Sequence, residues 1–253
     1  MSNHDRDLAS AFDAQAARFE VAQVQSDPAA LRRLVAFAGL PEGSRVLDTG
    51  CGPGLVSEAF LTAGHVVFGV DLSAEMVHRA GLRCGRFGPR AAFEQLSLHD
   101  PIPGAPYDAA VSRYVLHHVV DPLAFVRRQF KLLRPGGVLV LYDHTTDPDP
   151  VRAEQHERLE RDRDTTHTRN LTAGGLVDLL AVAGLVDLAM VEESFALDFD
   201  EWFDRGTPAA GKTDVRARLL AGPPVRGFLA AEQTDGSVRI DCVRAMLRGI
   251  RPF

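Results

Sequence analysis

The segment VLDTGCGPG, residues 46–54, constrains the fold of this chain more than any other stretch. Apolar residues lead into an acid, Asp48, and glycines follow at every second position, at Gly50, Gly52 and Gly54. A buried strand that runs through a glycine-rich turn into a helix is typical of nucleotide-binding α/β folds. The segment leaves open whether the ligand is a phosphate, a dinucleotide or a nucleoside.

The rest of the chain alternates between expected strands and helices. Apolar and β-branched stretches predict strands at residues 45–50, 65–71, 91–98, 107–115, 138–144, 186–197 and 237–250. Helical spacing and capping residues predict helices at residues 8–25, 27–40, 55–64, 73–83, 121–137, 172–185 and 198–206. This order predicts an α/β fold with a doubly wound, mostly parallel seven-stranded sheet, Rossmann-like, preceded by N-terminal helices.

An insertion is expected after the fifth strand. Residues 145–170 are highly charged and contain few apolar side chains, so they cannot form a core element. A helix near residues 150–163 followed by a loop is expected there. At 253 residues, the chain is expected to form a single domain over residues 1–253.

Composition narrows the class of protein. The net charge of −6 argues against a nucleic-acid partner. The cysteines, Cys51, Cys84 and Cys242, are widely spaced, which indicates neither a metal motif nor a disulfide framework. No apolar run approaches the length of a membrane span, and the N-terminus has no apolar signal core. A cytoplasmic protein with no membrane partner is therefore expected.

Residues around the glycine turn restrict the ligand further. The turn lacks the lysine of a phosphate-binding loop, so a nucleoside triphosphate is not expected. In the dinucleotide pattern GxGxxG the third glycine would fall at Leu55, and Asp48 would repel a pyrophosphate. Asp71 ends the next strand, where a carboxylate can accept hydrogen bonds from both hydroxyls of a ribose. Together these residues predict a charged nucleoside without phosphates, a description that S-adenosylmethionine meets.

Four ordered motifs make the chain resemble the class I S-adenosylmethionine-dependent methyltransferases: VLDTGCGPG, GVDLS, YDAAVSRYVLHHVVDP and LLRPGGVLVLYD. The LHH signature is similar to that of the small-molecule branch around the ubiquinone/menaquinone-type methyltransferases. The stretches RDTTHTR and FDEWFDRGTP also resemble small-molecule members of this branch. The resemblance implies S-adenosylmethionine as cofactor and a small-molecule methyl acceptor. It also implies that residues 1–40 form an N-terminal helical lid and residues 145–170 an acceptor lid.

The expected cofactor site gathers residues at the carboxyl ends of the strands. Relatives often place an acid at the end of the third strand to meet the adenine, but this chain has Ser97 and Leu98 in that segment. Adenine recognition is therefore expected from Ser97 or from backbone amides nearby. The expected cofactor-binding residues are Asp48, Gly50, Gly52, Gly54, Asp71, Leu72, Met76, Ser97, Leu98, Arg113 and Phe19.

Four histidines are candidates for a general base, which methyl transfer needs only when the acceptor must lose a proton. His117 and His118 follow the fourth strand, His144 ends the fifth, and His167 lies in the insertion. His118 and His144 are favoured, but the sequence leaves open which of His117 and His118 points toward the cofactor site. No metal site is expected.

The sequence leaves several functions open. The favoured one is methyl transfer to an oxygen, nitrogen or carbon of a small organic acceptor, such as a specialised metabolite or a quinone-like aromatic compound. The alternatives are a ubiquinone/menaquinone-type C-methyltransferase, and a methyltransferase-like protein that uses the cofactor non-catalytically or for another reaction. A nicotinamide-dependent oxidoreductase is disfavoured by Asp48 and Leu55. A homodimer is compatible with the sequence.

Overall fold

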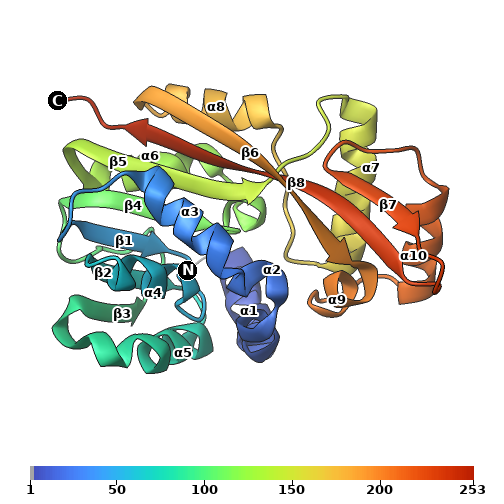
Figure 1. Cartoon of the computed structure of the whole chain (residues 1–253), viewed down its shortest axis with the longest axis horizontal. Coiled ribbons are helices and arrows are strands. Elements are labelled where there is room, and N and C mark those ends of the chain that lie inside the picture. The colour runs from blue at the N-terminus through green and yellow to red at the C-terminus, as the bar shows by residue number, and fades with distance from the viewer. Residues whose placement is uncertain (1–2) are drawn as a thin grey trace.

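Among residues 3–253, which the computed structural model describes, eight strands form one sheet (Figure 1). The strands span β1 Arg45–Thr49, β2 Val66–Asp71, β3 Ala91–Gln95, β4 Tyr107–Arg113, β5 Leu133–His144, β6 Val186–Asp198, β7 Phe228–Glu232 and β8 Val238–Ile250. Their order is β3-β2-β1-β4-β5-β8-β6, and β7 pairs with β8 outside this path. Strands β1 to β5 are parallel, whereas β8 runs antiparallel between β5 and β6. The predicted doubly wound, mostly parallel sheet of seven strands is confirmed, and β7 adds a short eighth strand.

Helices flank the sheet and begin at capping residues of the sequence. They span α1 Asn3–Val21, α2 Gln23–Ser26, α3 Pro28–Ala38, α4 Leu55–Thr62, α5 Ala74–Cys84, α6 Pro122–Leu132, α7 Pro150–Arg163, α8 Ala173–Val182, α9 Phe199–Asp204 and α10 Lys212–Ala221, with 3₁₀ turns η1 Gly85–Arg90 and η2 Leu116–His118. The side chains of Asp27, Ser73 and Asp121 accept first-turn N–H groups of α3, α5 and α6. The helix expected over residues 121–137 ends at Leu132, because the Arg-Pro-Gly-Gly sequence that follows does not continue a helix.

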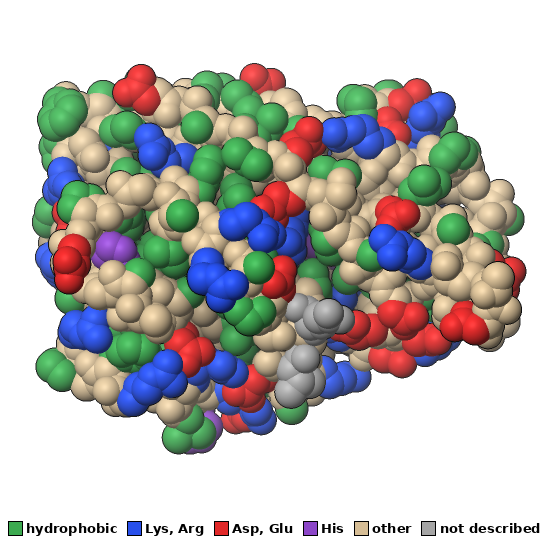
Figure 2. Space-filling view, viewed as in Figure 1, with side chains coloured by type: hydrophobic (Ala, Val, Ile, Leu, Met, Phe, Trp, Pro, Cys, Tyr) green, Lys and Arg blue, Asp and Glu red, His purple; other side chains and the backbone are tan. Residues whose placement is uncertain are grey.

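Basic and acidic side chains are interspersed over the face of the molecule shown in Figure 2. Several exposed charges of the chain are paired, such as Arg33 with Glu193 at 2.6 Å and Arg226 with Glu192 at 2.9 Å. Within residues 3–253, no helix is both long enough and apolar enough to cross a membrane.

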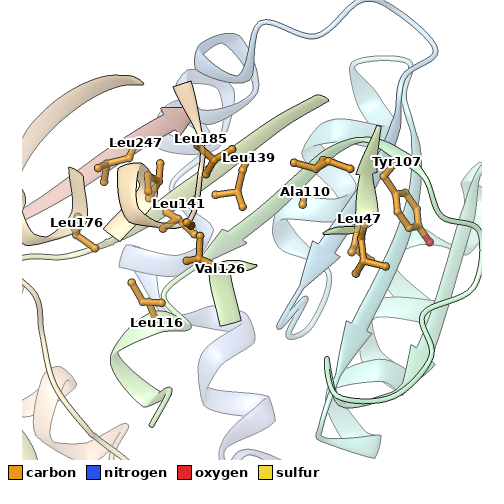
Figure 3. Packing of buried hydrophobic residues seen from close by; sticks show 14 of the residues in the cluster. Leu47, Tyr107, Ala110, Leu116, Val126, Leu139, Leu141, Leu176, Leu185 and Leu247 are labelled. Carbon is orange, nitrogen blue, oxygen red and sulfur yellow. The ribbon is translucent and has the colours of Figure 1, made fainter. Parts of the chain in front are cut away.

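Alternate side chains of the central strands pack against helices on opposite faces of the sheet. Leu139 and Leu141 of β5 join Val126 of α6 and Leu176 of α8 in one cluster (Figure 3). Val140, which lies between the two leucines, belongs to another cluster that includes residues of α3 and α4. Burial of both faces fixes the strand register. Because β1 to β5 pair in parallel, their carboxyl ends lie at one edge of the sheet.

Beyond the parallel strands, β6 and β8 continue and form a second lobe with β7 (Figure 1). Helices α7, α9 and α10 complete this second lobe around an apolar cluster that includes Leu159, Trp202, Val215, Phe228 and Ile240. The charged insertion contributes α7. Helix α10 and strand β7 are not predicted from the sequence, because α10 has little amphipathic pattern and β7 is only five residues long.

Candidate functional site

A cavity of about 500 Å³, the main cavity, lies at the carboxyl ends of the parallel strands. Such an edge is where doubly wound folds bind ligands. Ten of the predicted residues line it: Phe19, Gly50, Gly52, Asp71, Leu72, Met76, Ser97, Leu98, Arg113 and His118.

Asp71 is the central acid of the main cavity. Strand β2 delivers its carboxylate to the edge of the sheet, where it accepts the N–H of Gly52 at 2.8 Å and the N–H of Ser73 at 2.9 Å. Burial raises the pKa of Asp71, while these backbone hydrogen bonds favour its ionised form. A carboxylate has about four lone-pair sites, so the backbone N–H groups leave part of its capacity for a ligand.

Two glycines of the turn serve different purposes. Gly52 has φ +52°, and a Cβ placed there would have no atom within 4 Å, so the backbone presents an open cradle to the cavity. Gly54 has φ +83°, and a Cβ there would lie 3.0 Å from the Cα of Ala80. Gly54 therefore permits close packing of α4 against α5 and does not line the main cavity.

Asp48 also lies behind the cavity wall, although the sequence predicts an acid that faces the ligand. Its carboxylate is buried and accepts the hydroxyl hydrogen bond of Ser57 on α4 at 2.6 Å. Burial raises the pKa of Asp48 to about 7, against the hydrogen bond from Ser57. Asp48 thus braces the glycine turn from below, because its side chain points from β1 toward α4 rather than toward the cavity.

The segment after β3 forms a polar turn at the cavity. Strand β3 ends at Gln95, earlier than expected, and the N–H of Ser97 then donates to Asp100 at 2.9 Å. Ser97 and Leu98 line the main cavity together with Leu72, which follows β2, and Met76 of α5. This mixture of apolar surface and a few polar atoms suits a planar heteroaromatic group.

Helix α1 covers the main cavity, which it lines with His4, Asp5, Leu8, Phe12 and Phe19. The carboxylate of Glu20, near the end of α1, accepts hydrogen bonds from Arg79 and Arg83 of α5, both at 2.7 Å. Asp13 accepts the hydroxyl hydrogen bond of Ser73 at 2.5 Å. Polar contacts with α5 therefore hold α1 over the cavity.

Tyr114 separates the main cavity from a second, smaller one. Its φ of +59° is unusual for a residue with a side chain and marks local strain. Its ring stacks on His144 with centroids 4.6 Å apart, and its hydroxyl accepts a hydrogen bond from Arg244 at 2.6 Å. The neighbouring Arg113 donates to two backbone carbonyls of α2, so its side chain ties α2 to the sheet.

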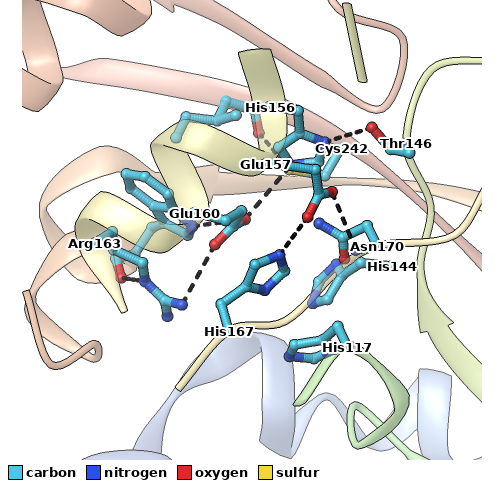
Figure 4. A network of polar contacts seen from close by, with 12 residues as sticks. His117, His144, Thr146, His156, Glu157, Glu160, Arg163, His167, Asn170 and Cys242 are labelled. Atoms are coloured by element: carbon cyan, nitrogen blue, oxygen red, sulfur yellow. Dashed lines mark hydrogen bonds and ion pairs between the residues drawn. The ribbon is translucent and has the colours of Figure 1, made fainter. Parts of the chain in front are cut away.

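The smaller cavity, of about 50 Å³, is called the histidine cavity (Figure 4). Its wall includes five histidines: His117, His118, His144, His156 and His167. It shares Phe19, Gln25, Tyr114 and His118 with the main cavity. The structure thus brings together all four histidines predicted as catalytic, beside the predicted cofactor site.

His117 forms a buried dyad with Asp143. Its Nδ1 donates to the carboxylate at 2.6 Å, and the same carboxylate accepts the N–H of Leu116 at 2.7 Å. Burial disfavours the charged ring, but the charge and hydrogen bond of Asp143 prevail and raise the pKa of His117. Because Nδ1 carries the proton, Nε2 is the free basic nitrogen.

The other candidate histidines have different surroundings. Burial and the nearby His117 hold the pKa of His118 well below its ordinary value, and its Nδ1 donates to the carbonyl of Thr166 at 3.1 Å. Burial and His117 likewise lower the pKa of His144 to about 3. His167 donates from Nε2 to Glu157 at 2.7 Å. The geometry therefore favours His117 as a base, over the His118 and His144 that the sequence favours.

Sequence reasoning did not assign four further residues at this site: Asp143, Glu157, Asn170 and Arg205. Asp143 carried a signal, since it ends a buried strand beside a candidate histidine. Glu157 and Asn170 lie in the insertion and Arg205 follows α9, where the sequence contains no motif that predicts a functional residue. In the part of the chain that the structure describes, no group of three or more His, Cys, Asp or Glu side chains could hold a metal ion.

Comparisons with known proteins agree with this geometry. A family model described as "Methyltransferase domain" matches residues 22–189. The chain is 39% identical over 192 residues to a ubiquinone biosynthesis O-methyltransferase of Xanthomonas axonopodis pv. citri, which covers 73% of this chain and 78% of that relative. The chain spans about half the length of other curated relatives with that name; the match in Xanthomonas campestris pv. campestris is 39% identical and covers 46% of this chain and 48% of the relative.

A further relative is the uncharacterized methyltransferase YcgJ of Bacillus subtilis, 29% identical over 82% of this chain and 84% of YcgJ. The crystal structure of YcgJ has a TM-score of 0.79 at 25% identity and covers 89% of this chain and 99% of that one. With its strand order and glycine turn, this chain belongs to the class I S-adenosylmethionine-dependent methyltransferases.

Proposed function

We propose that this protein transfers the methyl group of S-adenosylmethionine to a hydroxyl oxygen of a small organic acceptor. The observation that carries the proposal is the Asp143–His117 dyad at the histidine cavity, which shares a wall with the main cavity. An oxygen acceptor must lose a proton, and a histidine oriented by a carboxylate is suited to take it. The similarity to ubiquinone biosynthesis O-methyltransferases supports the same choice.

The main cavity would hold the cofactor, which supplies a methyl group already activated on a sulfonium. Asp71 would accept hydrogen bonds from the ribose hydroxyls, and the open backbone at Gly52 would admit the amino-acid portion. The slot lined by Leu72 and Ser97 would take the adenine. The residues present fit S-adenosylmethionine, because the open backbone at Gly52 and the carboxylate of Asp71 both line the main cavity.

This chain's own part in the reaction is to position the acceptor and to move its proton. Nε2 of His117 would accept the hydroxyl proton, and Asp143 would stabilise the resulting imidazolium. Such proton transfer typically contributes about 10²–10⁴-fold to the rate. Helix α1 would exclude water from the main cavity.

The test combines cofactor binding with product analysis. We expect S-adenosylhomocysteine, and not NADH, to raise the melting temperature, and we expect Asp71→Ala to weaken that binding. Methyl transfer from S-adenosylmethionine to a panel of simple phenols and catechols, followed by mass spectrometry, should give methyl ethers. Methylation confined to carbon or nitrogen, or stabilisation by NADH alone, would contradict the proposal.

A further inference from the structure

Two side chains of the histidine cavity carry hydrogen-bond donors that have no acceptor. The Nδ2 of Asn170 and the Nε and Nη1 of Arg205 are buried, and none of these atoms has a hydrogen-bond partner among the described residues. Both side chains line the cavity, and Arg205 is 7% exposed. Buried donors are nearly always paired in proteins, and an unpaired buried guanidinium is costly. These atoms therefore indicate a missing acceptor.

The nearest carboxylate does not remove this need. Oε1 of Glu201 forms an ion pair with Nη1 of Arg205 at 3.6 Å, beyond hydrogen-bond distance, and is itself buried without a hydrogen-bond partner. This pair still leaves Nε of Arg205 and Nδ2 of Asn170 without an acceptor. Burial lowers the pKa of Arg205 to about 10, and the nearby charge of Arg163 acts in the same direction. Arg205 thus remains an undercompensated cation in the wall of the cavity.

The acids in and next to the cavity already accept other hydrogen bonds, so they do not compete for these donors. Glu157 accepts from His167 at 2.7 Å and from the backbone N–H of Asn170 at 3.0 Å (Figure 4). Glu160 accepts from the indole of Trp202 at 3.3 Å and pairs with Arg163 at 3.5 Å.

Asp164 is occupied as well. It accepts both the N–H and the hydroxyl hydrogen bonds of Thr166, at 3.0 and 2.7 Å. Nε of Arg205 and Nδ2 of Asn170 are therefore left for a group that enters from outside the chain.

From these contacts we infer that Arg205 and Asn170 form a carboxylate-binding subsite, so that the methyl acceptor is a small hydroxy acid. This inference rests on the proposed function, whose reacting hydroxyl would lie at His117. A cavity of about 50 Å³ holds only a few water-sized groups, which suits a carboxylate rather than a whole acceptor. Arginine is the side chain best suited to a planar carboxylate.

The experiment measures binding of simple carboxylates against their neutral amides. Melting temperatures are recorded with acetate or benzoate, and with acetamide or benzamide, at constant ionic strength set by chloride. Each series is run with and without saturating S-adenosylhomocysteine. We expect a carboxylate to stabilise the wild type and its amide not to do so. In Arg205→Met the affinity for the carboxylate should fall about ten- to a hundredfold.

Controls separate a ligand site from a structural arginine. Arg216→Met removes an exposed arginine of the second lobe and should leave carboxylate binding intact. Without ligand, Arg205→Met should melt no lower than the wild type, because it removes an undercompensated buried charge. Asn170→Ala, which should also weaken carboxylate binding, covers the case in which Arg205→Met does not fold.

Two results would overturn the inference: carboxylates that stabilise no better than their amides, or carboxylate binding that survives in both variants. Either would mean that ordered water satisfies these donors. Failure of the proposed function is distinct, since it would show as absent stabilisation by S-adenosylhomocysteine whatever the carboxylates do.

Discussion

Asp143 orients His117, and this pairing governs how the rate should depend on pH. The base form of His117 accumulates above its pKa, which Asp143 raises above the ordinary value of about 6.5. The pH–rate profile should therefore have an ascending limb whose midpoint lies above pH 6.5. In Asp143→Asn the limb should move to lower pH, and kcat should fall about 10²-fold or more because the tautomer is no longer fixed.

The control for this pH–rate profile is His78→Asn, which removes an exposed histidine of α5 and should leave both the limb and kcat unchanged. His117→Ala should abolish the limb. A limb that persists in His117→Ala would assign the proton transfer to another group.

Asp48 makes a prediction about stability rather than activity. Its pKa is raised from 3.8 to about 7 in the folded chain, so the folded state holds the proton more tightly than the unfolded state. The protonated Asp48 carboxyl therefore stabilises the folded state fully at pH values below its unfolded pKa of 3.8. This stabilisation, about 4 kcal/mol at most, is lost as the pH rises through about 7. Asp48→Asn keeps a partner for Ser57 and should unfold at higher denaturant concentration than the wild type at pH 8.

The comparison of the two proteins at pH 4 serves as the internal control for Asp48, since the carboxyl is then largely neutral in the folded wild type. The difference in the free energy of unfolding should shrink toward zero there. An equal difference at both pH values would show that Asp48 is ionised throughout.

At the scale of elements, α1 is held over the main cavity by the ion pairs of Glu20 with Arg79 and Arg83. Such partly exposed pairs are each worth about 0.2–1 kcal/mol. Glu20→Gln should therefore raise the KM for S-adenosylmethionine about two- to tenfold and leave kcat nearly unchanged. The matched control is Glu154→Gln, which breaks exposed pairs on α7. A fall in kcat with constant KM would place α1 in the chemistry instead.

Elements differ in how well the sequence predicts them. Strands β1, β2, β4 and β5 are predicted because both faces are largely buried, which leaves apolar runs that end in turn residues. Asp71 follows from its place at the end of such a strand. Helix α10 and strand β7 escape prediction, because their stability comes from tertiary packing rather than from a local pattern. Helix α10 packs against α7 and β7, and β7 pairs with β8.

The site divides along the same line. The main cavity is built from motifs that follow strand ends, so most of its residues are predicted from the sequence. The histidine cavity joins the end of β5 with the insertion and with Arg205 beyond α9. Only tertiary packing places Asn170 and Arg205 in the wall of the same cavity. Position in the sequence also does not fix where a side chain points, since Asp48 lies near the end of β1 but contacts Ser57 of α4 instead of the main cavity.

At the scale of the whole molecule, β6 and β8 join the second lobe to the main sheet. Each strand is 13 residues long, and the two strands pair with each other through both parts, with one register shift between Val186 and Ala189. The single tryptophan, Trp202, is buried in the second lobe, so its fluorescence reports on that lobe, whereas far-UV circular dichroism reports on the whole chain. We expect the two probes to give one coincident unfolding transition.

Two matched truncations test this coupling. Leu219→Ala opens the core of the second lobe and Leu180→Ala opens the core beside the main sheet, and each should cost about 2–5 kcal/mol. Because the shared strands transmit the loss, each variant should shift the fluorescence and dichroism transitions equally. A fluorescence transition that moves for Leu219→Ala but not for Leu180→Ala would mean that the lobe unfolds separately. In that case the histidine cavity, which draws residues from both parts, could open while the main cavity remains folded.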